Sequence, residues 1–129
     1  MQVFEQFRTV SVDDIDHLNH VNNIRYLEWI QGIARAHWTS ITSNQQRQSN
    51  VWVVLRHEID YKASAYVGEN IHLKTYVTEC MGVTSIRIVE IYNADTQKLL
   101  VKSQTKWCLT DPESKRPKRI PVDILTIFD

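Results

Sequence analysis

The apolar residues between positions 22 and 41 recur with the period of an α-helix. Asn22 or Asn23 can cap the first turn, because a short polar side chain accepts hydrogen bonds from the free backbone N–H groups there. At 1.5 Å per residue this helix would be about 30 Å long. Its apolar positions form two adjacent rows, so we expect it to be covered on most sides: Ile24, Leu27, Ala34, Trp38 and Ile41 in one, and Tyr26, Ile30 and Ile33 in the other.

After residue 50 apolar and polar residues alternate, which is the period of β-strands. We predict four long strands at residues 53–61, 71–78, 83–92 and 99–109, and a weaker strand within residues 3–12. Over 83–92 the alternation slips, which predicts either a bulge or burial of both faces. The polar stretch 42–50 is expected to be a loop, and the short polar connection 93–96 suits an antiparallel hairpin.

The order of these elements, one strand, one long apolar helix and then four long strands, predicts an α+β fold with one domain over residues 1–129. One helix cannot cover both faces of a five-stranded sheet, so we expect a long antiparallel sheet that curls around a central helix. Such a sheet keeps unpaired edge strands and a partly apolar outer face, which favours a homo-oligomer.

Composition narrows the class of protein further. Fifteen Lys and Arg residues balance fifteen Asp and Glu residues, and a net charge of zero argues against a general nucleic-acid binder. No run approaches the roughly 18 apolar residues of a membrane span, and the first residues lack the features of a signal peptide. We therefore expect a cytoplasmic protein in which Cys80 and Cys108 are free thiols. The sequence has no Gly-x-Ser-x-Gly motif, which excludes an α/β-hydrolase.

The side chains best suited to chemistry are concentrated directly before the predicted helix: Asp13, Asp14, Asp16, His17, Asn19, His20, Asn22 and Asn23. A helix N-terminus can stabilise negative charge that develops on a substrate oxygen. A carboxylate beside it can act as a general base or a nucleophile. The alternatives are a polar turn that only caps the helix, and a metal site formed by the carboxylates and the two histidines. No third histidine follows at a spacing typical of metal sites, so we expect no metal.

Residues 16–28, Asp-His-Leu-Asn-His-Val-Asn-Asn-Ile-Arg-Tyr-Leu-Glu, closely resemble the Asp-x-x-x-His-Val-Asn-Asn-x-x-Tyr segment of hotdog-fold acyl thioesterases. The relatives are the 4-hydroxybenzoyl-CoA thioesterase-like enzymes, bacterial long-chain acyl-CoA thioesterases and plant acyl-ACP thioesterases. Residues 61–69 resemble the family's turn between two strands, and residues 116–121 resemble its Arg-Pro…Ile-Pro ending. Together the three matches cover essentially the whole chain.

The resemblance implies hydrolysis of an acyl-CoA or acyl-carrier-protein thioester, without a cofactor. It makes Asp16 the general base or nucleophile, and the backbone N–H near Asn23 the group that polarises the thioester carbonyl. His20 matches the motif histidine, which binds the carbonyl or orients the loop. Asn22 and Tyr26 match motif positions that shape the site and contact the substrate.

Four positions depart from the family pattern, and two of them are mild changes, Ser64 for the usual Pro and Glu69 for the usual Asp. Leu18 replaces an asparagine that the plant enzymes use in catalysis, so this chain lacks that member of their catalytic set. Asn19 stands where many members have Gly, and because Asn tolerates a positive φ, we expect the turn to survive. The resemblance also implies pairing of sheets edge to edge, as a homodimer or a homotetramer.

Residues 115–119, Lys-Arg-Pro-Lys-Arg, contain the densest group of basic side chains. They are either a solvated segment or a clamp for the phosphates of coenzyme A, with Arg116, Lys118 and Arg119 as contacts. The alternative to an enzyme is a non-catalytic module that binds acyl-CoA or acyl carrier protein on the same fold.

Overall fold

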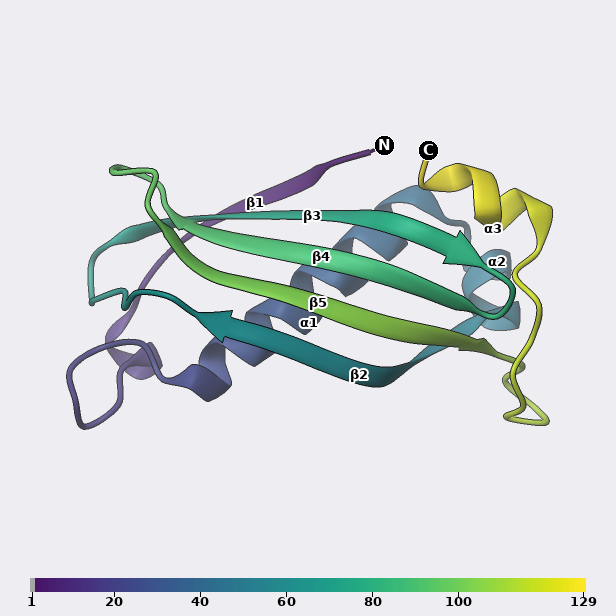
Figure 1. The fold of residues 1–129 in the computed structure, drawn as a ribbon, viewed down its shortest axis with the longest axis horizontal. Coiled ribbons are helices and arrows are strands. Elements are labelled where there is room, and N and C mark those ends of the chain that lie inside the picture. Colours follow the sequence, from purple (N-terminus) through teal and green to yellow (C-terminus); the bar gives the residue numbers. More distant parts are fainter. Residues whose placement is uncertain (1) are drawn as a thin grey trace.

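A five-stranded antiparallel sheet curls around one long helix in the computed structural model, which describes residues 2–129. The strands are β1 (Phe4–Thr9), β2 (Val51–Tyr61), β3 (Asn70–Met81), β4 (Thr84–Asn93) and β5 (Leu99–Thr110). Their order across the sheet is β1-β3-β4-β5-β2, so β1 and β2 form the two edges. Helix α1 (Asn23–Ile41) crosses one face of this sheet, as Figure 1 shows. The expected hotdog architecture is thereby confirmed.

Helix α1 begins where the sequence predicted, because Asn22 caps it. The Asn22 side-chain oxygen accepts a hydrogen bond from the Ile24 N–H at 3.0 Å. The predicted apolar surface faces the sheet, with Tyr26, Trp29 and Ile33 buried against residues of β3, β4 and β5. Ile24 is an exception, because it lies in the first turn and is exposed.

The predicted slip over residues 83–92 results from burial on both faces. Arg87, Ile88 and Val89 are consecutive residues of β4, and all three are buried. The pairing of strands is irregular at Thr78 of β3, at Leu55 of β2 and at Leu100 of β5, opposite the step from Ile91 to Tyr92 of β4. Each leaves one extra residue on its strand, which bends the sheet around the helix.

Two short helices were not predicted. Residues 42–50 were expected to be a loop, and this is wrong in part, because Asn44–Ser49 form helix α2. A capping box starts α2, in which Ser43 and Gln46 exchange side-chain to backbone hydrogen bonds. Helix α3 (Val122–Ile127) follows Pro121 and buries Ile124 in a second apolar cluster at the far end of the sheet.

The edge strand β2 presents apolar side chains to solvent. Val51, Val53, Leu55 and Tyr61 are all exposed on it. Among residues 2–129, no helix is both long enough and apolar enough to cross a membrane.

Candidate active site

The segment between β1 and α1 is held in one conformation by contacts with the turn that follows β2. The Val21 N–H donates to the Ala65 carbonyl at 2.9 Å, and the Val10 N–H donates to the Glu69 carbonyl at 2.9 Å. Ile15 and Val21 pair as an isolated antiparallel bridge, which closes the intervening residues into a loop. Two of the three segments that carry the family resemblance, residues 16–28 and 61–69, therefore contact each other.

Asp16 lies at the start of this closed loop. Its Oδ1 accepts a hydrogen bond from the Leu18 N–H at 2.8 Å, and its own N–H donates to the His20 carbonyl at 3.0 Å. The side chain of Asp16 is 20% exposed, so solvent or a substrate can reach the carboxylate. Asn19 adopts a φ of 66°, so the left-handed turn expected there is confirmed.

His20 lies beside the same carboxylate. Its Nδ1 is 3.8 Å from Asp16 Oδ1, which is too long for a hydrogen bond, and 3.3 Å from the Val21 carbonyl oxygen. The His20 side chain is 28% exposed. Among residues 2–129, no Lys or Arg forms an ion pair with Asp16, so its charge is not neutralised by a fixed cation.

The first turn of α1 follows directly. Asn22 uses its side chain on Ile24, and the Asn22 N–H donates to the Asp14 carbonyl at 3.0 Å. The hydrogen bonds between described residues leave the Asn23 N–H without an acceptor. This free N–H at the positive end of the helix can hydrogen-bond an oxygen that carries developing negative charge.

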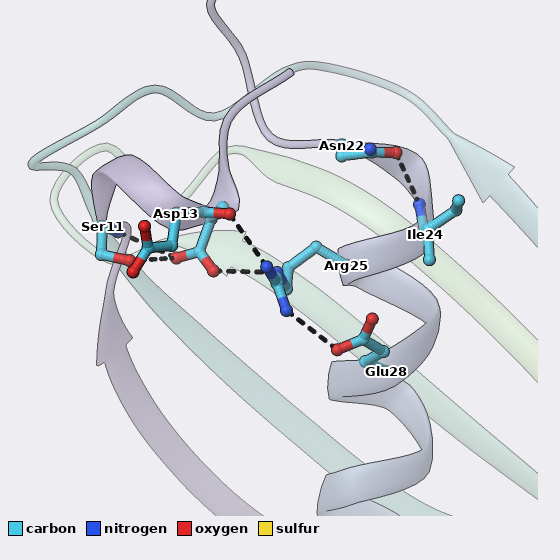
Figure 2. A network of polar contacts seen from close by, with 7 residues as sticks. Ser11, Asp13, Asn22, Ile24, Arg25 and Glu28 are labelled. Carbon is cyan, nitrogen blue, oxygen red and sulfur yellow. Dashed lines mark hydrogen bonds and ion pairs between the residues drawn. The ribbon is translucent and has the colours of Figure 1, made fainter.

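Arg25 connects the loop to the helix, and sequence reasoning assigned it no role (Figure 2). Its Nε lies 3.0 Å from Asp14 Oδ1, and its Nη2 donates to the Asp13 carbonyl at 2.9 Å. Its Nη1 donates to Glu28 at 3.0 Å, one turn further along α1. Asp14 also accepts a hydrogen bond from the Ser11 N–H at 2.8 Å. Of the three clustered carboxylates, Asp14 is thus used by the fold, whereas Asp16 remains available.

Tyr26 lies beneath the loop and is 2% exposed. Its hydroxyl accepts a hydrogen bond from the Ala65 N–H at 3.2 Å, and burial raises the pKa of this hydroxyl above its usual value. The structure therefore gives Tyr26 a supporting position, in which it holds the turn after β2 against the helix.

Residues 10–128 match the model of the thioesterase-like superfamily. The chain belongs to this superfamily. The resemblance that the sequence motifs showed is thereby confirmed, and family membership supports thioester hydrolysis as the activity. None of the curated proteins matches the chain.

Solved structures, thioesterases among them, share the fold over nearly the whole chain. The 1,4-dihydroxy-2-naphthoyl-CoA thioesterase from Synechocystis has a TM-score of 0.86 at 19% identity, over 98% of this chain and 96% of its own. A hypothetical protein from Staphylococcus aureus in complex with CoA has a TM-score of 0.87 at 16% identity, over 98% of this chain and 81% of its own. A mutant of 4-hydroxybenzoyl CoA thioesterase complexed with 4-hydroxybenzoyl CoA has a TM-score of 0.87 at 11% identity, over 100% of both chains.

The basic segment of this thioesterase-like protein, residues 115–119, follows β5 and lies at the opposite end of α1 from Asp16 (Figure 1). Arg116 and Arg119 are exposed. Lys118 is partly buried, and its Nζ donates to the Ser49 carbonyl at 2.9 Å, at the end of α2. Within one protomer, the structure does not bring these predicted phosphate contacts together with Asp16.

A cavity of about 530 Å³ lies between the second half of α1 and the sheet. Val51 to Val54 of the edge strand β2 line it. Sequence reasoning did not find this cavity, because its walls come from six separate segments of the chain. Over the part of the chain that the structure describes, no group of three or more His, Cys, Asp or Glu side chains is arranged to hold a metal ion.

Proposed function

We propose that this protein hydrolyses acyl-CoA thioesters, and that Asp16 is its catalytic carboxylate. One observation carries the proposal: Asp16 is held in a closed loop, accessible and without a Lys or Arg partner among residues 2–129, directly before the helix that offers the free Asn23 N–H. Membership of the thioesterase-like superfamily supports the reaction class. The CoA and acyl-CoA complexes among the structural neighbours support coenzyme A as the thiol, and a 12:0-ACP thioesterase among the same neighbours keeps acyl carrier protein as the alternative.

The reaction can follow either of two routes from this geometry. In the first, Asp16 removes a proton from water, and the water oxygen attacks the thioester carbonyl carbon. In the second, the carboxylate attacks this carbon itself and forms an anhydride, which water then hydrolyses. In both routes the C–S bond breaks, the sulfur leaves with the electron pair and takes up a proton, and the acid is released. The Asn23 N–H would stabilise the oxyanion, and His20 would orient the loop or bind the carbonyl.

The active form that we propose is a homodimer joined along β2, alone or within a tetramer. The exposed apolar edge of β2 supports this arrangement, because an unpaired strand with apolar side chains pairs readily with another strand. If two copies of β2 pair antiparallel about their midpoint, Val51 of one protomer lies opposite Tyr61 of its partner. The Tyr61 hydroxyl donates to the Asn23 carbonyl at 3.4 Å, so this end of β2 marks the start of α1.

Antiparallel pairing would also explain the position of the basic segment. It turns one protomer end for end relative to the other, so residues 115–119 of one protomer move toward the Asp16 end of the partner. Arg116 and Arg119 can then contact the phosphates of coenzyme A, with Lys118 in a supporting role. We propose that each complete site combines Asp16 from one protomer with phosphate contacts from the other.

A panel of acyl-CoA thioesters, with release of the free thiol measured, tests the activity. We expect turnover of at least one member of the panel, and loss of that turnover in Asp16→Asn. Binding of acyl-CoA without thiol release by any member would instead assign the protein as a binding module.

A further inference from the structure

The cavity between α1 and the sheet contains a buried cation. Arg87 of β4 lines the cavity and is 5% exposed. Its Nη1 lies 3.0 Å from Thr75 Oγ1 and 3.0 Å from His37 Nδ1, and both of these partners are neutral acceptors. A guanidinium has five N–H donors and no acceptor, so His37 must accept this bond through an unprotonated Nδ1.

No carboxylate compensates this charge among residues 2–129. Each ion pair in that part of the chain involves a cation other than Arg87. Burial lowers the pKa of Arg87 to about 10. A buried charge without a counter-ion is strongly unfavourable, so proteins normally pair such a group. The guanidinium therefore offers a site that an anion would stabilise.

The remaining walls define the shape of the ligand. Trp38, Trp52, Trp107 and Phe128 line the same cavity, and Phe128 packs 5.6 Å from the Arg87 guanidinium. Within residues 2–129, the buried Trp107 indole N–H has no acceptor. Flat apolar walls around a cation suit a ligand with an apolar or aromatic body and an anionic end.

We propose that this cavity binds the acyl group of the substrate, and that Arg87 selects acyl groups whose far end carries a carboxylate. This inference rests on the proposed thioesterase activity and names its substrate class. Residues at the Val51 end of β2 line the cavity, and in the dimer proposed above this end lies next to the start of the partner's α1. An acyl group held at that thioester site can cross the edge of the sheet and reach Arg87.

Two thioesters of equal length test the selection in the full-length protein: octanoyl-CoA, with a methyl end, and the half-thioester of octanedioic acid with CoA. We expect kcat/KM of the wild type to favour the carboxylate-ended substrate by about tenfold or more. In Arg87→Met this ratio should fall by about tenfold to a hundredfold, the scale of a hydrogen bond between charged groups. Arg87→Lys should keep part of the preference, and Lys98→Gln, an exposed cation in the β4–β5 turn, should keep all of it. An unchanged ratio in a folded Arg87→Met, or equal use of both substrates by the wild type, would overturn the selection.

Direct binding to the wild type and to Arg87→Met separates this inference from the proposed activity. By calorimetry on the wild type, octanoate should bind at least tenfold more tightly than octanamide, which has nearly the same shape and no charge. Equal affinities, or binding of neither, would show that the cavity does not select an anion, whether or not the protein hydrolyses thioesters. If octanoate is preferred, the preference is lost in Arg87→Met and no thioester is hydrolysed, the cavity assignment stands and the proposed activity fails.

Discussion

Asp16→Asn removes the basicity of one side chain and leaves its contacts in place. The contact that orients Asp16 is the bond from the Leu18 N–H to Oδ1 at 2.8 Å, and an asparagine oxygen accepts this bond equally well. The carboxylate forms no ion pair with Lys or Arg in the described chain, so no cation is left uncompensated by the change. We therefore expect the free energy of unfolding to change by less than about 0.5 kcal/mol, the usual range for a surface substitution.

The effect on catalysis should be much larger. A positioned general base contributes about 10²- to 10⁴-fold to a rate, so kcat should fall by at least about a hundredfold. Because the substituted side chain acts on the reacting atoms, KM should change far less than kcat. The assay is thiol release from the best acyl-CoA of the panel, with thermal unfolding measured on the same samples.

Asp13→Asn is the matched control, because the described contacts of Asp13 use its backbone carbonyl and its side chain is exposed. Activity of Asp13→Asn should stay within about twofold of the wild type, which is less than 0.5 kcal/mol. Wild-type turnover in a folded Asp16→Asn would refute the assignment of the catalytic carboxylate. Asp14 is not an equivalent control, since its side chain binds both the loop and Arg25.

Four further predictions follow from other parts of the structure. Asp14→Asn should lower the free energy of unfolding by about 1–3 kcal/mol, measured by urea denaturation, because it removes the partly buried ion pair with Arg25 and leaves one side-chain oxygen for contacts that now use two. Burial and then the nearby Arg87 lower the pKa of His37 to about 4, so between about pH 6.5 and 4 only the unfolded chain binds a proton at this residue. The free energy of unfolding should therefore fall by up to about 3 kcal/mol as the pH drops from 6.5 to 4. His37→Gln should remove this part of the pH dependence. Leu55→Glu should convert the dimer to monomers, as measured by light scattering. Leu55 lies near the midpoint of an antiparallel β2 pair, so the two new carboxylates, one from each protomer, would lie close together. A dimer of unchanged stability would exclude pairing along this strand. Replacing Arg116 and Arg119 together by Gln should raise KM for acyl-CoA at low salt and leave kcat nearly constant. The hydrolysis of an acyl-N-acetylcysteamine, which has no phosphates, should be unaffected. An unchanged KM for acyl-CoA would show that residues 115–119 are a solvated connection.

The fold could be predicted because its elements differ in period. The apolar rows over residues 22–41 give a helix, and the alternating segments after residue 50 give strands, with boundaries close to those of α1 and β2 to β5. Helix α2 could not be found in this way, since its residues are polar throughout and expose no apolar row. Its signal is the Ser43–Gln46 capping box, which is local and independent of hydrophobic period.

Only part of the candidate site could be predicted from the sequence, because some of its residues are far apart in the chain but close in space. Asp16, His20 and Asn22 are local neighbours, so a motif could place them together. The ion pair of Arg25 with Asp14 joins residues eleven apart across a loop closure that periodicity does not report. The distance of the basic segment from Asp16 depends on the direction of β5, which the order of elements alone did not reveal.

Arg87 shows why a buried functional group is hardest to infer from sequence. It occupies an inward position of β4 between Ser85 and Val89, where an apolar residue is expected. The slip in alternation over residues 83–92 predicted a bulge or burial of both faces, and did not indicate a functional cation. A charged residue in such a position is tolerated when its partners lie on other elements, here Thr75 on β3 and His37 on α1. These neutral partners satisfy one nitrogen and leave the charge uncompensated. Rules such as the alternation of apolar and polar residues fail most often at residues that serve a functional site rather than the fold. Arg87, a cation that lines a cavity with aromatic walls, occupies such a position.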